Sequence, residues 1–287
     1  MENICPYCKS LNSYIDSICV NCGALEEYES CYVAVVGSVF ENGICRDSIE
    51  GITLRNKDER PHYIRATKGY EARQMHLNNW YNNTKHPFIL MLDSDMVFPA
   101  NTLERLRANK APFVSGFYMR RTIRPVLPVW FERGQPGIMP MKPMTALLER
   151  DKTYPIGASG WGCVLIHRDV VTAMKPLLKG EPEIIEDDMD IYPYDLKEVL
   201  AGREQIKPLR GLKDPVGSDI RFPFYAQLAG FPLLGDTGVC CDHVVDYPIS
   251  INDWLNQPVS AVRDLSLYIA QQNRDEQENV RKAVTCE

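Results

Sequence analysis

Short apolar runs alternate with amphipathic segments along most of the chain. The run YVAVVGSVF spans Tyr32–Phe40, and FILML at Phe88–Leu92 is apolar at all five positions. Continuous apolar runs of this length are typical of strands that are buried on both faces of a parallel sheet. We also predict a second, weaker strand at His62–Thr67 and strands at Phe113–Arg120, Val126–Glu132 and Gly162–His167.

Segments with helical spacing and capping signals separate the predicted strands. We expect helices at Gly69–Asn83, at Asn101–Asn109, from Asp169 onward, and in the run IRFPFYAQLAG that follows Ser218-Asp219. Strands that alternate with helices predict an α/β fold, with a mixed, mainly parallel sheet and flanking crossover helices. A polar amphipathic helix is expected at Ser260–Val284.

Two CxxC pairs mark the first 27 residues as a separate unit. Cys5 and Cys8 form the first pair, and Cys19 and Cys22 form the second, ten residues later. Four thiolates can bind one Zn²⁺ tetrahedrally, and each CxxC folds its short turn around the ion. We predict a structural Zn²⁺ in a four-cysteine zinc ribbon, and the alternative is four unrelated thiols or a redox pair. The predicted domains are therefore the ribbon at 1–27, a main domain at 31–250 and a helical extension at 251–287.

Composition and charge narrow the class of protein. The chain has 287 residues, of which 45% are hydrophobic and 24% charged, as in an ordinary globular protein. The net charge of −6 gives no overall attraction to nucleic acid or to anionic lipid. The N-terminus lacks the pattern of a secretory signal, and no run of 18 apolar residues is present. These features predict a cytoplasmic protein without a membrane span.

A basic segment runs against this acidic balance. Residues 104–133 carry seven Arg or Lys side chains against two Glu. The segment can be solvated surface, or it can be a strip that faces a phosphate or an acceptor molecule.

An Asp-x-Asp motif follows the FILML run. Asp93-Ser94-Asp95 stands where the predicted strand ends, and ligands of open α/β sheets bind at the carboxyl ends of strands. Alternate residues of an extended segment point the same way, so the two carboxylates can converge. Converging carboxylates need a cation or a proton between them. Mg²⁺ or Mn²⁺ suits hard oxygen ligands and bridges diphosphate oxygens. The alternative is a turn with a local Asx hydrogen bond.

Five segments in this order resemble the GT-A class of glycosyltransferases, especially its family 2-like members, over roughly residues 31–245. The segments are Val33–Ser38, Gly69–Arg73, Asp93–Asp95, Gly160–Arg168, and Ser218-Asp219 followed by Phe222, Gly230 and His243. The chain departs from the family pattern at two positions. Ser218 stands where members often have Glu, and Gln74 stands where they often have Asn.

The resemblance implies a role for each matching residue. Asp95 would bind Mn²⁺ or Mg²⁺ directly, Asp93 would bind it through water or hold donor hydroxyls, and His243 would complete the metal site. Asp219 would be the general base, and its alternative role is the cap of the following helix. The remaining residues would contact the donor: Arg73, Trp161 as a stacking surface, and Gly160, which with Gly162 permits close approach of backbone to ligand.

These assignments predict a metal-dependent glycosyltransferase that uses a nucleotide-sugar, by resemblance a UDP-sugar, with inversion if Asp219 is the base. The acceptor stays open among a glycan, a protein, a metabolite and a hydroxylated DNA base. One alternative is a nucleotidyltransferase that uses the same carboxylates, although Val36-Gly37-Ser38 lacks a glycine-rich phosphate loop. The other is a zinc-ribbon adaptor that binds nucleic acid or protein without catalysis.

Overall fold

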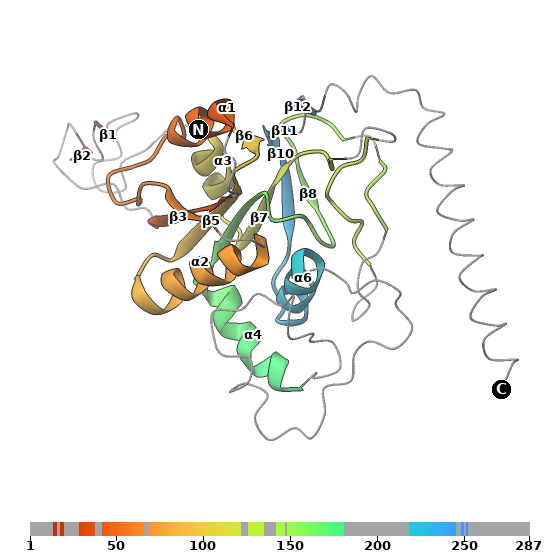
Figure 1. Ribbon diagram of the computed structural model, residues 1–287. Helices are drawn as coiled ribbons and strands as arrows, with labels where there is room; N and C mark the ends of the chain where they lie inside the picture. The colour runs from red at the N-terminus through yellow and green to blue at the C-terminus, as the bar shows by residue number, and fades with distance from the viewer. Residues whose placement is uncertain are drawn as a thin grey trace, which may run out of the picture.

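A seven-stranded sheet forms the centre of the part of the chain that the structure describes (Figure 1). The computed structural model describes residues 14–15, 18–19, 29–37, 42–65, 69–121, 126–134, 142–146, 148–180, 218–244, 248–249 and 251. In spatial order the strands are β4 (His62–Arg65), β3 (Cys31–Gly37), β5 (Phe88–Asp93), β9 (Cys163–His167), β7 (Phe113–Phe117), β10 (Leu234–Cys240) and β8 (Thr153–Pro155).

Five of the seven strands run in one direction. β3 is parallel to both β4 and β5, and β7 is parallel to β10. β9 is antiparallel to β5 and β7, and β8 is antiparallel to β10. The prediction of a mixed, mainly parallel α/β sheet is confirmed.

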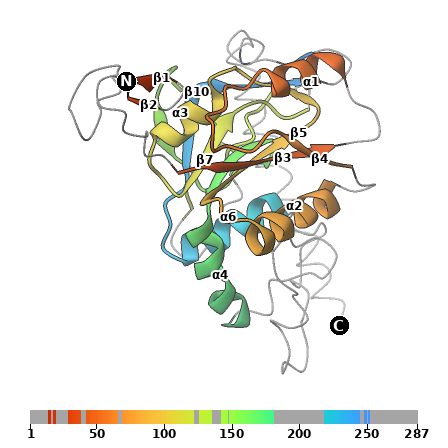
Figure 2. The ribbon, with the colours of Figure 1, turned by 90° about the vertical axis from the view of Figure 1, so that its left-hand side faces the viewer.

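Helices cover both faces of this sheet (Figure 2). α1 (Gly43–Glu50) and α3 (Thr102–Ala108) lie on one face, and α3 packs against β7, β9 and β10. α2 (Gly69–Asn83), α4 (Arg168–Gly180) and α6 (Ser218–Leu228) lie on the other face, where α2 packs against β3 and α4 packs against β9 and α6. Helix α2 has the bounds that the sequence pattern predicts.

The apolar runs are buried as expected. All seven residues of β3 are buried, and β5 is buried at every position except its last, Asp93. A strand with apolar side chains on both faces must lie between two layers of helices, which is where β3 and β5 lie. Because β5 carries no polar residue before Asp93, this carboxylate is the first polar group at the edge of the sheet.

Two of the predicted strands differ from the structure. Phe113–Arg120 leaves the sheet after Phe117, and Val126–Glu132 makes only isolated bridges, such as that between Pro128 and Met119. Pro128 has no N–H to donate to a ladder, so it cannot sit within a continuous central strand. These two segments instead run alongside each other beyond the carboxyl end of β7.

A second, small sheet lies at the same edge. It pairs β6 (Met96–Val97), β11 (Asp242–Val244) and β12 (Pro248–Ile249), with β11 in the middle. Strands of two or three residues leave no periodic pattern, and the sequence did not predict them. The antiparallel register places His243 opposite Met96, the residue that follows Asp95.

Two predicted units fall largely outside the described residues. Within 1–27, the structure describes a two-stranded hairpin of β1 (Tyr14–Ile15) and β2 (Ile18–Cys19), in which Cys19 pairs with Tyr14. Cys5, Cys8 and Cys22 lie outside the described residues, as does the helix expected at 260–284. Among the helices that are described, none is both long and apolar enough to cross a bilayer.

Candidate functional site

A pocket of about 620 Å³ lies at the edge of the sheet where β5 ends. Its lining residues come from the start of α2, the end of β5, the segments that follow β7, the turn before β9, the first turns of α6, and β11. They are Gly69, Tyr70, Arg73, Asp93, Tyr118, Arg120, Arg121, Val129, Phe131, Gly160, Trp161, Ile220 and His243. The structure thus brings together five residues that the sequence singled out from separate segments: Arg73, Asp93, Gly160, Trp161 and His243.

Asp93 is fixed by its backbone and neutralised by Arg73. Its N–H donates to the carbonyl of Gly162 at 3.0 Å, which holds the end of β5 beside the turn that precedes β9. The Nη2 of Arg73 donates to both carboxylate oxygens of Asp93, at 2.7 and 2.9 Å. Each of the two side chains is 19% exposed. This ion pair joins the first turn of α2 to the end of β5 at the wall of the pocket.

Asp95 and His243 meet because β6 pairs with β11. The N–H of Val244 donates to the backbone carbonyl of Asp95 at 2.9 Å, and the Nε2 of His243 lies 3.5 Å from the Oδ2 of Asp95. Arg121 completes the cluster, because its Nε donates to the Nε2 of His243 at 2.9 Å and its Nη2 donates to the Oδ2 of Asp95.

The hydrogen bonds of His243 define its tautomer. The Nδ1 lies 3.0 Å from the carbonyl oxygen of Met119, which can only accept, so Nδ1 carries the proton. Nε2 is therefore the acceptor and presents its lone pair toward Arg121 and Asp95. Burial lowers the pKa of His243 below its usual value, and the charge of Arg121 lowers it further, although Met119 and Asp93 act in the opposite direction. A neutral imidazole held at Nδ1 by a carbonyl is the form in which histidine binds metals.

Asp95 has a carboxylate oxygen whose surroundings fit a bound cation. Its Oδ1 is buried and has no hydrogen-bond partner. A buried carboxylate oxygen without a partner is costly, and a bound cation would satisfy it. Asp95 and the Nε2 of His243 are therefore a fitting pair of ligands for Mn²⁺ or Mg²⁺, ions that take their remaining ligands from water and substrate phosphates. No cluster of three or more His, Cys, Asp or Glu with metal-binding geometry occurs in the described ranges.

The two carboxylates of the motif have different partners. Strand β5 ends at Asp93, and Ser94 and Asp95 form a turn, so the alternation expected of an extended segment stops there. Asp93 is bonded to Arg73, whereas Asp95 is bonded to Arg121. In this arrangement only Asp95 stands beside the nitrogen of His243.

The glycines before β9 pack closely against Tyr118, and Gly160 also lines the pocket. A Cβ at Gly160 would collide with the phenol oxygen of Tyr118, and a Cβ at Gly162 would lie 2.9 Å from its ring. The N–H of Gly162 donates to that oxygen at 2.8 Å. Burial, and next the charge of Asp93, raise the pKa of Tyr118 well above its usual value. No local sequence pattern marks Tyr118, because its importance comes from this packing.

Trp161 is mostly a packing residue. It is 2% exposed, and its ring meets that of Phe222 in α6 edge to face, with centroids 4.8 Å apart. The indole thus anchors α6 to the turn before β9 while it forms part of the pocket wall. Asp219 is the second residue of α6, directly before Ile220, which also lines the pocket.

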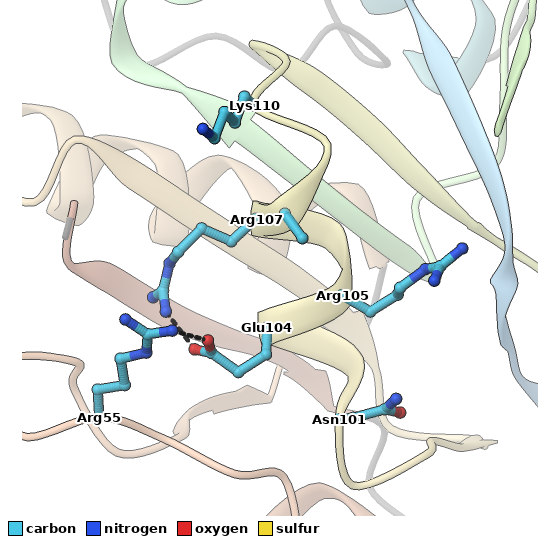
Figure 3. A pocket seen from close by; sticks show the side chains of 7 residues that line it. Arg55, Asn101, Glu104, Arg105, Arg107 and Lys110 are labelled. Atoms are coloured by element: carbon cyan, nitrogen blue, oxygen red, sulfur yellow. Dashed lines mark hydrogen bonds and ion pairs between the residues drawn. The ribbon is translucent and has the colours of Figure 1, made fainter. Parts of the chain in front are cut away.

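A second cavity, of about 440 Å³, lies beside α3 and holds part of the basic segment (Figure 3). Its arginines are engaged within the protein. Arg55 and Arg107 both bond Glu104, toward which they point in Figure 3. In addition, Arg107 pairs with Asp58 at 2.7 Å. A third arginine of this cavity, Arg105, pairs with Asp236 at 2.9 Å.

The fold therefore divides the basic segment between two places. Arg105, Arg107 and Lys110 line the cavity beside α3, whereas Arg120 and Arg121 line the pocket at the end of β5. These five basic residues therefore do not line one common pocket.

Comparison with known proteins adds little to this geometry. No family model matches the chain, and no curated protein matches it. Among solved structures, the chain is similar to A197 from STIV, with a TM-score of 0.49, 11% identity, and coverage of 79% of this chain and 92% of that one. It is also similar to GalNAc-T7 with UDP, GalNAc and Mn²⁺, with a TM-score of 0.44, 12% identity, and coverage of 79% of this chain and 46% of that one. Likeness at this level assigns no function to the chain.

Proposed function

We propose that the chain is a metal-dependent glycosyltransferase of GT-A type that takes a sugar from a nucleotide-sugar, by resemblance a UDP-sugar. The observation that carries the proposal is the pairing of Asp95 and His243 beside the pocket at the end of β5. A buried, unpartnered carboxylate oxygen and a neutral imidazole nitrogen are placed together there.

Asp95 and His243 would hold Mn²⁺ or Mg²⁺ in this proposal. The bound ion would neutralise the charge that develops on the departing diphosphate. Two protein ligands leave coordination positions for diphosphate oxygens, as expected for an ion that binds together with its nucleotide. Asp93 belongs to the donor side, because its carboxylate is already oriented by Arg73.

The donor would lie against the start of α2 and the turn before β9. Arg73 supplies positive charge for the phosphates or a partner for the base, and Asp93 accepts hydrogen bonds from donor hydroxyls. Gly160 and Trp161 form the opposite wall, with Tyr118 packed behind the turn.

Asp219 would be the general base. Its carboxylate would accept the proton of the acceptor hydroxyl while that oxygen bonds to the anomeric carbon and the bond from this carbon to the diphosphate oxygen breaks. A single displacement of this kind inverts the anomeric configuration. The support is the place of Asp219 in the chain, at the start of α6 and adjacent to the pocket-lining Ile220.

The amino-terminal cysteines would bind a separate, structural Zn²⁺. Cys5, Cys8, Cys19 and Cys22 would supply four thiolates, and Cys19 lies at the end of the described hairpin. This site is independent of the catalytic cation, which prefers oxygen ligands.

A nucleotide titration tests the proposal. Zinc-loaded protein is titrated with a panel of nucleotides and nucleotide-sugars, with Mn²⁺ and with a chelator, and binding is measured by calorimetry. We expect one nucleoside diphosphate and its sugar conjugates to bind only with Mn²⁺. Asp95→Asn and His243→Gln should weaken this binding by about 100-fold or more, because loss of even an outer-shell partner of a metal costs about 10–100-fold in affinity. Asp47→Asn, on the exposed surface of α1, is the matched control and should bind like the wild type.

Binding that ignores Mn²⁺, or that survives in Asp95→Asn, would contradict the metal site. If no nucleotide binds to the folded protein, the Asp-x-Asp segment is a turn without a metal-binding role. The adaptor hypothesis then becomes the one to test, with duplex DNA at low salt as the first ligand.

A further inference from the structure

Arg121 lies between the two proposed metal ligands. Its Nη2 donates to the Oδ2 of Asp95, and its Nε donates to the Nε2 of His243 at 2.9 Å. The neutral imidazole of His243 has one lone pair, at Nε2, and the bond from Arg121 uses it, so a cation could not bind this nitrogen while Arg121 does. Arg121 and a cation therefore cannot be bound to Asp95 and His243 in this geometry at the same time.

The arrangement differs from an ordinary surface ion pair. A guanidinium usually binds a carboxylate through both oxygens. Here one donor goes to the Oδ2 of Asp95 and another goes to an imidazole, while the buried Oδ1 of Asp95 has no partner. The ligand cluster is thus only partly satisfied by Arg121, and a cation with more coordination positions would satisfy it further.

The side chain of Arg121 can also move away from Asp95 and His243. Its side chain is 60% exposed, whereas those of Asp95 and His243 are 30% and 9% exposed. The ligands are fixed by the pairing of β6 with β11, but a side chain that is mostly in solvent loses little packing when it changes rotamer. Arg121 lines the same pocket as Arg73, so a displaced guanidinium stays within reach of a ligand bound there.

We propose that Arg121 is a latch on the cation site, which deepens the proposed function and rests on it. Without donor, its guanidinium takes the place of the cation between Asp95 and His243. When the cation enters with a nucleoside diphosphate, Arg121 is displaced from both ligands and binds diphosphate oxygens, for which its planar fork is well suited.

The latch makes binding of the cation and the nucleotide cooperative. The free cation has to compete with an internal charge, so it binds weakly on its own. With the diphosphate present, the displaced Arg121 gains a new partner, and each ligand raises the affinity for the other. A second consequence is that the charge of Asp95 is compensated by Arg121 until the donor binds.

Two binding measurements test the latch without any activity assay. Binding of Mn²⁺ alone to the zinc-loaded full chain is followed by electron paramagnetic resonance, for the wild type, Arg121→Gln, Arg120→Gln and Asp95→Asn. UDP binding at saturating Mn²⁺ is followed by calorimetry for the same proteins. Arg120→Gln is the matched control, since it removes the same charge from the same pocket, where Arg120 lies 4.9 Å from the centre of the Phe131 ring.

We expect Arg121→Gln to bind free Mn²⁺ about tenfold more tightly than the wild type, because removal of a charge-assisted bond relieves the competition. The same variant should bind UDP at saturating Mn²⁺ about tenfold more weakly. Arg120→Gln should change the affinity for free Mn²⁺ by less than about threefold, as expected from screened charge alone. Asp95→Asn should abolish Mn²⁺ binding.

The outcomes distinguish a failure of the latch proposal from a failure of the proposed metal-dependent function. If Asp95→Asn abolishes Mn²⁺ binding but Arg121→Gln matches the wild type, the latch is wrong and the metal site stands. An equal gain in Arg120→Gln and Arg121→Gln would reduce the effect to general charge and also overturn the latch. If none of the folded proteins binds Mn²⁺, the latch and the proposed metal-dependent function fail together.

Discussion

His76, a buried side chain of α2, makes the stability of the protein depend on pH. It is fully buried, and its Nε2 lies 2.9 Å from the carbonyl of Val35, so this nitrogen carries a proton. The Nδ1 lies 3.3 Å from the hydroxyl of Tyr32. Burial lowers the pKa of His76 from 6.5 to about 4, and the hydrogen bond to Val35 only partly offsets this. The folded protein therefore keeps the ring neutral where the unfolded chain would protonate it.

Acidification is expected to destabilise the protein through His76. The stabilisation by the neutral ring is complete above pH 6.5, and it is lost progressively as the pH falls to about 4, because only the unfolded chain binds the proton in that window. The loss amounts to roughly 3 kcal/mol over the window. Urea unfolding at several pH values measures it, and His76→Gln should show a correspondingly shallower pH dependence. Parallel curves for the two proteins would contradict the assignment.

At the residue scale, the sequence singled out several residues that line one pocket, but it did not predict the contacts between them. Arg73, Asp93 and Asp95 stand in local patterns that a strand end or a helix start makes recognisable. Tyr118 and Arg121 stand in no such pattern, because each acts through contacts with residues that are distant in the chain. Those contacts exist only after the sheet has formed.

At the scale of a single element, one arginine holds the carboxyl end of α2. Arg168, the first residue of α4, donates to the backbone carbonyls of Trp80, Tyr81 and Thr84, at 2.8, 2.6 and 3.0 Å. Its guanidinium also lies 4.8 Å from the centre of the Trp80 ring. The last carbonyls of a helix have no partner within the helix, and one arginine supplies several donors here. This residue therefore joins α2 to α4.

Replacement of Arg168 by lysine is expected to destabilise the protein although the charge is retained. An ammonium cannot reproduce the planar fork, so some of the carbonyls at the end of α2 lose their donor. The expected cost is about 2–4 kcal/mol in the free energy of unfolding, from two or more lost charge-assisted bonds. Thermal and urea unfolding measure it. Arg46→Lys, on the exposed face of α1, is the control and should stay within about 0.5 kcal/mol of the wild type.

Elements were predictable in proportion to their length and burial. β3 and β5 are largely apolar runs of 7 and 6 residues, α2 has 15 residues, and all three elements were predicted. β6 and β11 have two and three residues, and their pairing depends on a tertiary contact that no local pattern records. The predicted strand at Val126–Glu132 was wrong because apolar residues there cover the pocket instead of joining the ladder.

For the whole molecule, the wall of the pocket is tied to the far strands of the sheet through Trp130. This residue is fully buried between Val129 and Phe131, both of which line the pocket. Its Nε1 donates to the hydroxyl of Ser115 and to the carbonyl of Gly116, each at 3.1 Å. The ring packs closely against Gly235 of β10, so a change at this position in the sheet reaches the site.

A methyl group at Gly235 is expected to disturb both stability and binding. The added Cβ of Gly235→Ala would lie 2.5–2.7 Å from ring carbons of Trp130. The indole ring is rigid, so these carbons cannot bend away from the added methyl group. Overpacking of this kind costs about 1–3 kcal/mol. Because the ring carries the pocket wall, nucleotide affinity should fall as well. Gly43→Ala, which meets nothing within 4 Å, is the control for both measurements. If Gly235→Ala is destabilised but its nucleotide affinity is unchanged, the pocket wall that Trp130 carries does not contribute to nucleotide binding.

The pairing of β6 with β11 has a consequence for how the protein is made. Asp95 and His243 are far apart in the chain, and they meet only after β10 has joined the sheet. Such distant contacts form slowly, since a long loop has to close before they contribute any stability. A growing chain on the ribosome, or one clipped before β10, would carry both aspartates of the motif without the imidazole. Affinity for the proposed cation would then arise only after β11 has been made and has paired with β6, and it would report that these distant segments have folded together.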